Sequence, residues 1–223
     1  MTKGLRTLVV GVSALIGLGG MAACSSGSPT EPTPQATSSP GAATSAAPAV
    51  AQSGNYVTRA DQDGQPMSIG IAVQGDRIAG YACNGVDEEA WFFGEQHDGD
   101  IDITSKSEDT LQAEFDGDAF VGDLTMDGRT FNFTAPGVPA PGGLYLAELD
   151  GTRATWVVQP DGSSIGNQSG GGSDTGDTGE RARNRRVEIV RASALTRQPD
   201  GTMRATINGQ SVVAEPLGGD FRF

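Results

Sequence analysis

Short turn-forming dipeptides recur along the middle of the chain and constrain its fold more than any other feature. Each pairs Asp or Asn with Gly, and such pairs favour the positive φ angles of tight hairpin turns. They stand at Asp63-Gly64, Asn84-Gly85, Asp98-Gly99, Asp116-Gly117, Asp127-Gly128, Asp150-Gly151 and Asp161-Gly162. The runs between them have about the length of a β-strand. This spacing predicts an antiparallel meander.

Apolar and polar residues alternate within several of these runs. Phe131 and Phe133 share one face of their run, and Leu111, Ala113 and Phe115 repeat the pattern. No run shows a sustained helical period with caps. We therefore expect about ten strands, near residues 56–61, 67–74, 77–83, 89–96, 100–105, 110–115, 118–126, 129–134, 143–149 and 152–159.

A one-sided apolar face on this many strands has to be buried. Closing the sheet into a barrel, or folding it into a two-layer sandwich, buries the face and removes exposed edges. The predicted fold class is therefore all-β, a barrel or sandwich of about 8–10 strands. Eight aromatic residues are expected to supply most of the core: Trp91, Phe93, Phe115, Phe120, Phe131, Phe133, Tyr145 and Trp156.

The N-terminus has the pattern of an export signal. Lys3 and Arg6 precede an uncharged apolar run, Leu8 to Gly20, that is too short to span a bilayer as a helix. Met21-Ala22-Ala23-Cys24 then resembles the bacterial lipobox. The resemblance implies a lipoprotein signal peptide over residues 1–23 and acylation of Cys24. The mature chain would then be anchored by lipid to the extracytoplasmic face of the cell membrane.

Composition divides the remaining chain into four parts. Residues 24–54 are rich in Pro, Ser, Thr and Ala and predict a disordered stalk. Residues 55–169 hold the β-meander, and residues 170–180 are a Gly-rich linker. Residues 181–223 predict a β-hairpin appendage that is too small to form a core by itself. It must dock on the meander, pair with another protein or stay partly disordered.

Charge is unevenly distributed over these parts. Residues 54–170 contain 20 acidic residues against 5 basic ones, whereas residues 181–223 contain 8 arginines against 4 acidic residues. The acidic part argues against nucleic acid as a partner, because such binding depends on neutralising phosphates. It suits a basic envelope protein, or serves solubility alone. The Arg-rich start of the appendage, residues 181–186, could dock on the acidic part.

Cys83 has no intramolecular partner if Cys24 is acylated. It lies in a predicted strand, and the acidic residues Asp87, Glu88 and Glu89 follow it closely. Negative charge raises a thiol pKa and opposes catalysis, and no histidine other than His97 is available to lower it. We therefore expect Cys83 to be a buried, inert thiol.

The other candidate metal-binding and catalytic residues are expected to have structural roles. Asp98, Asp100 and Asp102 would share one face of a strand and suggest Ca²⁺, but the later ligands of a calcium loop are out of position. We expect a solvated hairpin edge there, and a surface position for His97. No P-loop, Rossmann or zinc-ligand pattern occurs. No catalytic, cofactor-binding or metal-binding residue is assigned, and catalysis is not expected.

One short motif suggests a function that the surrounding sequence does not favour. Asn184-Arg185-Arg186-Val187-Glu188-Ile189 resembles the terminal motif of OmpA-like peptidoglycan-binding domains. The match covers only these residues. In place of that family's upstream helices, the chain has its Gly-rich linker.

A wider resemblance covers roughly residues 55–168. The runs Tyr81–Gly85, Ala90–Gly94, Gly143–Tyr145 and Trp156–Gly162 are similar to a pattern in uncharacterised actinobacterial, mycobacterial-type cell-envelope lipoproteins. The resemblance implies a source and a compartment but no catalytic residues. We therefore expect a non-catalytic binding module of the cell envelope, held by its lipid anchor. The alternatives are a carrier of an apolar ligand in a barrel cavity and a cell-envelope hydrolase.

Overall fold

A computed structural model describes residues 51–170 and 188–223 of the chain. Strands are the only regular secondary structure in these residues, which confirms the predicted all-β class. Within the same ranges, no helix has the length and apolar character needed to cross a membrane. The strands form two sheets, a closed barrel and a second, curled sheet.

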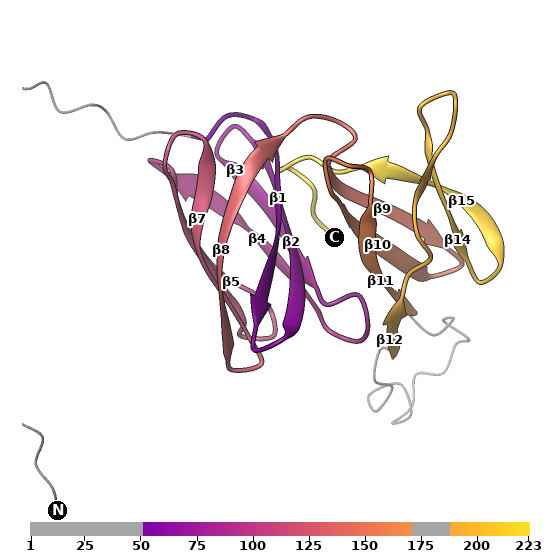
Figure 1. The fold of residues 1–223 in the computed structure, drawn as a ribbon, viewed down its shortest axis with the longest axis horizontal. Coiled ribbons are helices and arrows are strands. Elements are labelled where there is room, and N and C mark those ends of the chain that lie inside the picture. Colours follow the sequence, from indigo (N-terminus) through magenta and orange to yellow (C-terminus); the bar gives the residue numbers. More distant parts are fainter. Residues whose placement is uncertain (1–50, 171–187) are drawn as a thin grey trace, which may run out of the picture. The chain divides into compact units, whose positions relative to one another are not determined.

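The barrel closes eight antiparallel strands in sequence order, as Figure 1 shows for the strands from indigo to salmon. The first and last strands complete it through the pairs Asn55↔Val138 and Tyr56↔Gly137. The predicted meander is therefore a barrel rather than a sandwich. Its strands are β1 (Gly54–Gln62), β2 (Gln65–Gln74), β3 (Arg77–Cys83), β4 (Glu89–His97), β5 (Asp100–Thr104), β6 (Thr110–Phe115), β7 (Ala119–Met126) and β8 (Arg129–Val138).

Tight turns connect several neighbouring strands, as the dipeptides predicted. Asp63, Asp98 and Asp127 each have a positive φ, between 48° and 55°, and each is followed by a glycine with positive φ. This conformation matches the right-handed twist of the strands that it joins. The β2–β3 turn differs, because only its first residue, Gly75, has a positive φ, of 59°.

Apolar side chains from all eight strands occupy the barrel interior. Phe115, Phe120, Phe131 and Phe133 lie there as predicted, together with Tyr56. The other large side chains of this core are Met67, Ile69, Ile71, Val73, Ile78, Phe92, Ile101, Ile103, Leu111, Leu124 and Met126. The barrel interior is therefore a packed core of side chains.

Two of the predicted core residues, both on strand β4, lie outside the core. Phe92 points into the barrel and is 1% exposed, whereas Trp91 and Phe93 lie on the outer face and are partly buried. Alternate residues of a strand face opposite sides, so only one of the two sets can enter the core. Trp91 and Phe93 belong instead to an aromatic cluster outside the barrel.

The second sheet has the order β12-β11-β10-β9-β15-β14-β13. It takes in the last two predicted strands of the meander, which the sequence pattern assigned to the same sheet as the others. Tyr145 and Trp156 therefore pack in the core of this second sheet. Its strands are β9 (Gly143–Leu149), β10 (Thr152–Val158), β11 (Ser164–Gly170), β12 (Glu188–Arg191), β13 (Thr196–Arg197), β14 (Met203–Ile207) and β15 (Gln210–Pro216).

The C-terminal strands are part of the folded body. Strand β15 pairs with β9 through Glu215↔Leu146 and Pro216↔Tyr145. Of the three outcomes expected for residues 181–223, docking is therefore the one observed for the described residues. Ser193, which follows β12, bonds to β14 across the curl, since its hydroxyl donates to the Thr206 carbonyl (2.9 Å) and accepts from the Thr206 amide (2.8 Å).

A third apolar cluster joins the barrel to the second sheet. The barrel contributes Val57, Ala72, Tyr81 and Cys83 from its outer face, and the second sheet contributes Leu144, Val157 and Leu217. Gly70 lets the two sheets approach closely, because a Cβ there would lie 3.0 Å from Leu144 Cγ. The two sheets thus share buried apolar surface.

Candidate interaction surface

Polar side chains, with Val121 as the exception, cover the outside of the barrel on strands β5 to β8. We call this surface the outer face. Its residues alternate along each strand with the residues that point into the core. Its residues are Asp100, Asp102, Thr104, Thr110, Gln112, Glu114, Val121, Asp123, Thr125, Thr130, Asn132 and Thr134.

Four threonines form one row across the outer face. The strand register places Thr104 opposite Thr110, Thr110 opposite Thr125, and Thr125 opposite Thr130. The hydroxyl oxygens of Thr125 and Thr130 lie 3.1 Å apart, within hydrogen-bonding distance. Such cross-strand pairs hold the side chains of neighbouring strands in register.

A second row alternates carboxylates with amides. It runs from Asp102 through Gln112 and Asp123 to Asn132. Gln112 Nε2 donates to Asp102 Oδ1 at 3.2 Å, and Asn132 Nδ2 donates to Asp123 Oδ1. These amides orient the carboxylates without neutralising them.

The outer face is acidic and lacks compensating cations nearby in the sequence. Residues 89–136 contain 12 acidic residues against two basic ones, Lys106 and Arg129. Within residues 51–170 and 188–223, the salt bridge between Arg129 and Glu88 (2.6 Å) is the one that forms. The carboxylates of the outer face are thus available to a cationic partner.

The acidic surface continues into a groove between β4 and β5. The ladder between these strands has two residue pairs, Gln96↔Ile101 and His97↔Asp100, whereas β3 and β4 share seven. Beyond these pairs the strands diverge, and a hollow of about 440 Å³ lies between them. We call it the seam groove; its lining is Phe93, Gly94, Glu95, His97, Asp100, Asp102, Ile103 and Thr104.

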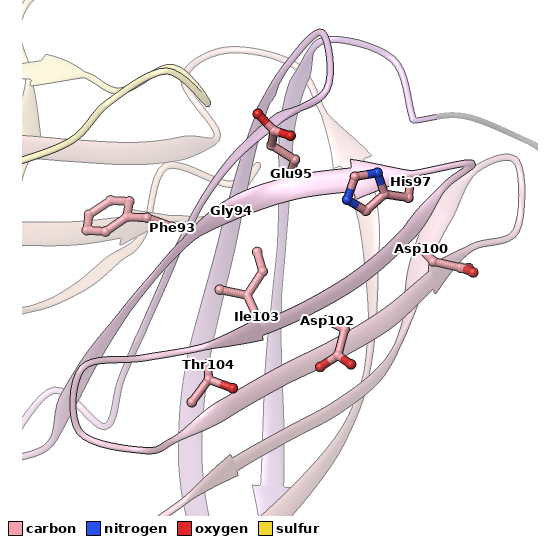
Figure 2. Close-up of a pocket in the computed structure, with 8 residues that line it drawn as sticks. All are labelled: Phe93, Gly94, Glu95, His97, Asp100, Asp102, Ile103 and Thr104. Carbon is pink, nitrogen blue, oxygen red and sulfur yellow. The ribbon is translucent and has the colours of Figure 1, made fainter.

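Figure 2 shows how side chains line the seam groove. Ile103 lies between the two strands, with Glu95 on the β4 side and Asp102 on the β5 side. A Cβ at Gly94 would lie 2.7 Å from Ile103 Cγ1, so glycine at this position makes room for the isoleucine. The floor of the groove is thus apolar and its rim is acidic.

Aromatic residues lie at the Phe93 end of the groove. Phe93 stacks on Trp91 with a centroid distance of 5.4 Å, and Phe221 and Phe223 of the C-terminal segment pack against both rings. Arg222 lies between these two phenylalanines in sequence. It donates to the Gly94 carbonyl at 3.2 Å, and its guanidinium carbon lies 5.3 Å from the Phe93 ring centroid.

Cys83 is buried, as predicted, and its surroundings disfavour reactivity. It is fully buried and has no disulfide partner in the described residues. Burial is the main cause that raises its pKa to about 12, and the charge of Glu89 raises it slightly further. Hydrogen bonds with Tyr81 and with the Gly85 backbone, and the charge of Arg191, oppose this rise in the pKa. The thiol is therefore protonated at physiological pH.

The structure places the other sequence candidates on the surface. His97 ends β4 and is exposed, as predicted. Asp98 lies in the following turn, with a φ of 54°, whereas Asp100 and Asp102 point outward from β5. In the described ranges, no group of three His, Cys, Asp or Glu side chains is placed to hold a metal ion.

Some sequence candidates lie outside the described residues. These are Cys24, the segments 1–23 and 24–50, and residues 171–187. Of the OmpA-like motif, only Glu188 and Ile189 are described, and they begin β12. The predicted stalk extends into the described part, where Ala51 is already buried and its amide donates to Gln96 Oε1 at 3.1 Å.

Sequence reasoning missed the seam groove and the position of Arg222. A ladder that stops after two pairs leaves no sequence signal, because the length of a ladder does not follow from the residues of either strand. Phe221-Arg222-Phe223 could have indicated a docked segment, since two phenylalanines flank a cation there. Their target on β4 was not predictable from the segment itself.

Comparison of the chain with protein-family models, with curated proteins and with solved structures gives no match. The function is therefore inferred from the residues and their geometry alone.

Proposed function

We propose that this protein is a non-catalytic binding module of the cell envelope that recognises a basic envelope protein through the outer face of its barrel. An acyl group on Cys24 would hold it on the extracytoplasmic face of the cell membrane, and the part of the predicted stalk before the buried Ala51, residues 24–50, would serve as the stalk. The lipobox supports the anchor, and the resemblance to actinobacterial lipoproteins supports the compartment.

The observation that carries the binding role is the unpaired negative charge of the outer face. The register puts Asp100 opposite Glu114, so like charges lie side by side on neighbouring strands. Like charges in this position are destabilising, and a fold selected for stability alone would gain from a lysine there. A basic partner would relieve this repulsion and be steered to the face from a distance.

The alternative functions have less support. A carrier would need space inside the barrel, and large side chains such as Phe92, Phe120 and Phe131 occupy that interior. A glycoside hydrolase needs two carboxyl groups on opposite sides of a substrate. Glu95 and Asp102 come from the two sides of the seam groove, but both are exposed, whereas a general acid sits in an apolar pocket that keeps it protonated.

Chemical crosslinking on native membranes of an actinobacterial host, followed by affinity capture of the full chain, tests this function. We expect one basic envelope protein to be captured by the wild type. A variant with Asp100→Asn, Glu114→Gln and Asp123→Asn should capture much less of it. The matched control removes the same charge from the second sheet through Glu148→Gln, Asp150→Asn and Glu215→Gln, and should capture as much as the wild type.

The anchor is tested in the same host. We expect the wild type in the membrane fraction and Cys24→Ala outside it, because a diacylglyceryl group is lost with the thiol. Equal capture by the outer-face variant and the wild type would count against the binding role, whatever the result for Cys24.

A further inference from the structure

Two seams of the barrel have a ladder of two residue pairs, β4–β5 and β1–β8, and the hollow at β4–β5 is the one lined by Glu95, Asp100 and Asp102. In a regular barrel each strand pairs along its length with both neighbours. Among the described residues, the β4–β5 ladder ends at Gln96↔Ile101, so the β4 segment from Trp91 to Glu95 has no paired residue on β5. An extended segment of another chain uses such open backbone for recognition.

The charges around the groove select for a cation. Glu95 comes from β4, and Asp100 and Asp102 come from β5. Glu114 of β6 lies opposite Asp100 and adds a further negative charge. No Lys or Arg is among the described residues that line the groove, and His97 lies at its hairpin end.

The chain's own Arg222 shows how β4, beside the groove, holds an arginine. Its guanidinium donates to the Gly94 carbonyl at 3.2 Å and lies over the Phe93 ring, 5.3 Å from the ring centroid. A guanidinium combines a planar hydrogen-bonding fork with stacking on an aromatic face, and lysine offers neither. Arg222 is not among the residues that line the groove, and the groove around Glu95 and Asp102 stays open.

We propose that the seam groove binds an extended, arginine-rich segment of a partner protein. The inference rests on the proposed binding function and adds to it the place and the kind of segment. The partner backbone lies along β4 between Trp91 and Glu95. Its alternate side chains, which point to the same side of a strand, place arginines beside Glu95 and Asp102.

Peptide titration tests this proposal on the full chain. The probe is a fluorescent heptapeptide that alternates arginine and valine, and anisotropy reports its binding at low and high salt. We expect the double variant Glu95→Gln, Asp102→Asn to bind it about 5- to 10-fold more weakly than the wild type, in keeping with the loss of two partly exposed ion pairs. The control pair Glu148→Gln, Glu215→Gln removes the same charge from the second sheet and should weaken binding less than 2-fold.

Two further probes separate the elements of recognition. A lysine–valine heptapeptide should bind several-fold more weakly than the arginine peptide, because lysine lacks the planar fork. An arginine–valine peptide with N-methylated valines keeps its charge but loses backbone donors, and it should also bind several-fold more weakly. Equal binding of all three peptides would overturn the groove as a strand-recognition site.

The outcomes also distinguish this proposal from the binding function on which it rests. If the Glu95→Gln, Asp102→Asn variant captures the membrane partner as well as the wild type does, the groove is not the binding site. The rest of the outer face can still be that site. Peptide binding that appears only after Arg181, Arg183, Arg185 and Arg186 are replaced by glutamine would overturn the partner assignment, because the chain's own arginines would then be the occupant. If Glu95→Gln, Asp102→Asn and the control pair weaken peptide binding equally, the attraction is nonspecific and the proposal is wrong.

Discussion

At the residue scale, Cys83 lies where β3 meets the second sheet and has no exposed surface. Burial raises its pKa to about 12, and the thiolate is the form that attacks disulfide reagents. In a Cys24→Ser chain, Cys83 is the single thiol. We expect that thiol to stay unreactive toward an aromatic disulfide at pH 8 in the folded protein and to react fully in urea. Rapid reaction without denaturant would show that the interface opens.

The same thiol makes stability depend on pH in a defined direction. The pKa is 9.0 in the reference state and about 12 in the folded protein. The unfolded chain therefore loses this proton first as the pH rises above 9, and Cys83 lowers stability by at most about 1.4 kcal/mol per pH unit in that window. Below pH 9 it contributes nothing. Urea unfolding at pH 8 and pH 10 should show the wild type losing stability relative to Cys83→Ala.

Position 122 on β7 requires glycine because the neighbouring strand β6 lies close to it, and not because of its own backbone angles. A Cβ at this position would overlap the Gln112 carbonyl oxygen and lie 2.6 Å from Ala113 Cα. Because backbone cannot yield as a side chain can, we expect Gly122→Ala to lower the unfolding free energy by about 1–3 kcal/mol. Gly170→Ala is the control, since nothing lies within 4 Å of its Cβ. Urea unfolding measures both, and equal stability of the two variants would contradict the packing at β7.

Turn residues were the part of the fold that sequence predicted best. Asp98, Asp127 and Asp150 have positive φ angles and each precedes a glycine, so their local preference alone determines the turn. Asp116 precedes a glycine too, but its φ is not positive. Its carboxylate instead accepts the amides of Asp118 and Ala119, and these bonds lower its pKa. A short dipeptide therefore predicts a turn more securely than it predicts the turn type.

At the element scale, β4 shows where alternation stops being informative. Trp91, Phe92 and Phe93 are consecutive and all aromatic, so hydrophobicity does not decide which side enters the core. The decision comes from neighbours distant in sequence: Phe221 and Phe223 cover the outer pair, and Phe92 joins the barrel core. The groove beside β4 has the same origin, because a ladder's length depends on how the whole barrel closes.

The register of β4 gives a stability prediction. Phe92 is 1% exposed within the barrel core, and its replacement by alanine should lower the unfolding free energy by about 3–5 kcal/mol. Phe93 is partly buried on the outer face, and Phe93→Ala should cost less than half as much. Urea unfolding followed by circular dichroism gives both values. A larger effect at Phe93 would mean that the strand faces the other way.

At the scale of the whole molecule, local pattern predicted the strands but not their division between two sheets. Strands β9 and β10 carry the same alternation as the barrel strands, and a hairpin connects them in the same way. What separates them is the pairing of β9 with β15, between residues such as Leu146 and Glu215 that lie far apart in sequence. Such a contact depends on the closure of a long loop and has no local signature.

The two tryptophans of the chain report on different parts of the fold, and Trp91 also contacts Phe221 and Phe223 of the C-terminal segment. Trp91 lies on the barrel and Trp156 in the core of the second sheet. Because Leu144 and Val157 share a buried cluster with Tyr81 of the barrel, we expect the sheets to unfold together. Fluorescence of Trp91→Phe and Trp156→Phe chains in urea should therefore give coincident transitions.

A charge placed in that shared cluster should separate the two transitions. Leu144 is fully buried against the position of Gly70, so Leu144→Asp would leave a carboxylate without a partner between the sheets. We expect the tryptophan of the second sheet to unfold at lower urea in this variant, since that sheet depends on strand pairs with its own distant C-terminal segment. The exposed Glu148→Asp change on the same strand is the control and should leave the transitions coincident. Separate transitions in the wild type would mean that the shared cluster does not couple the sheets.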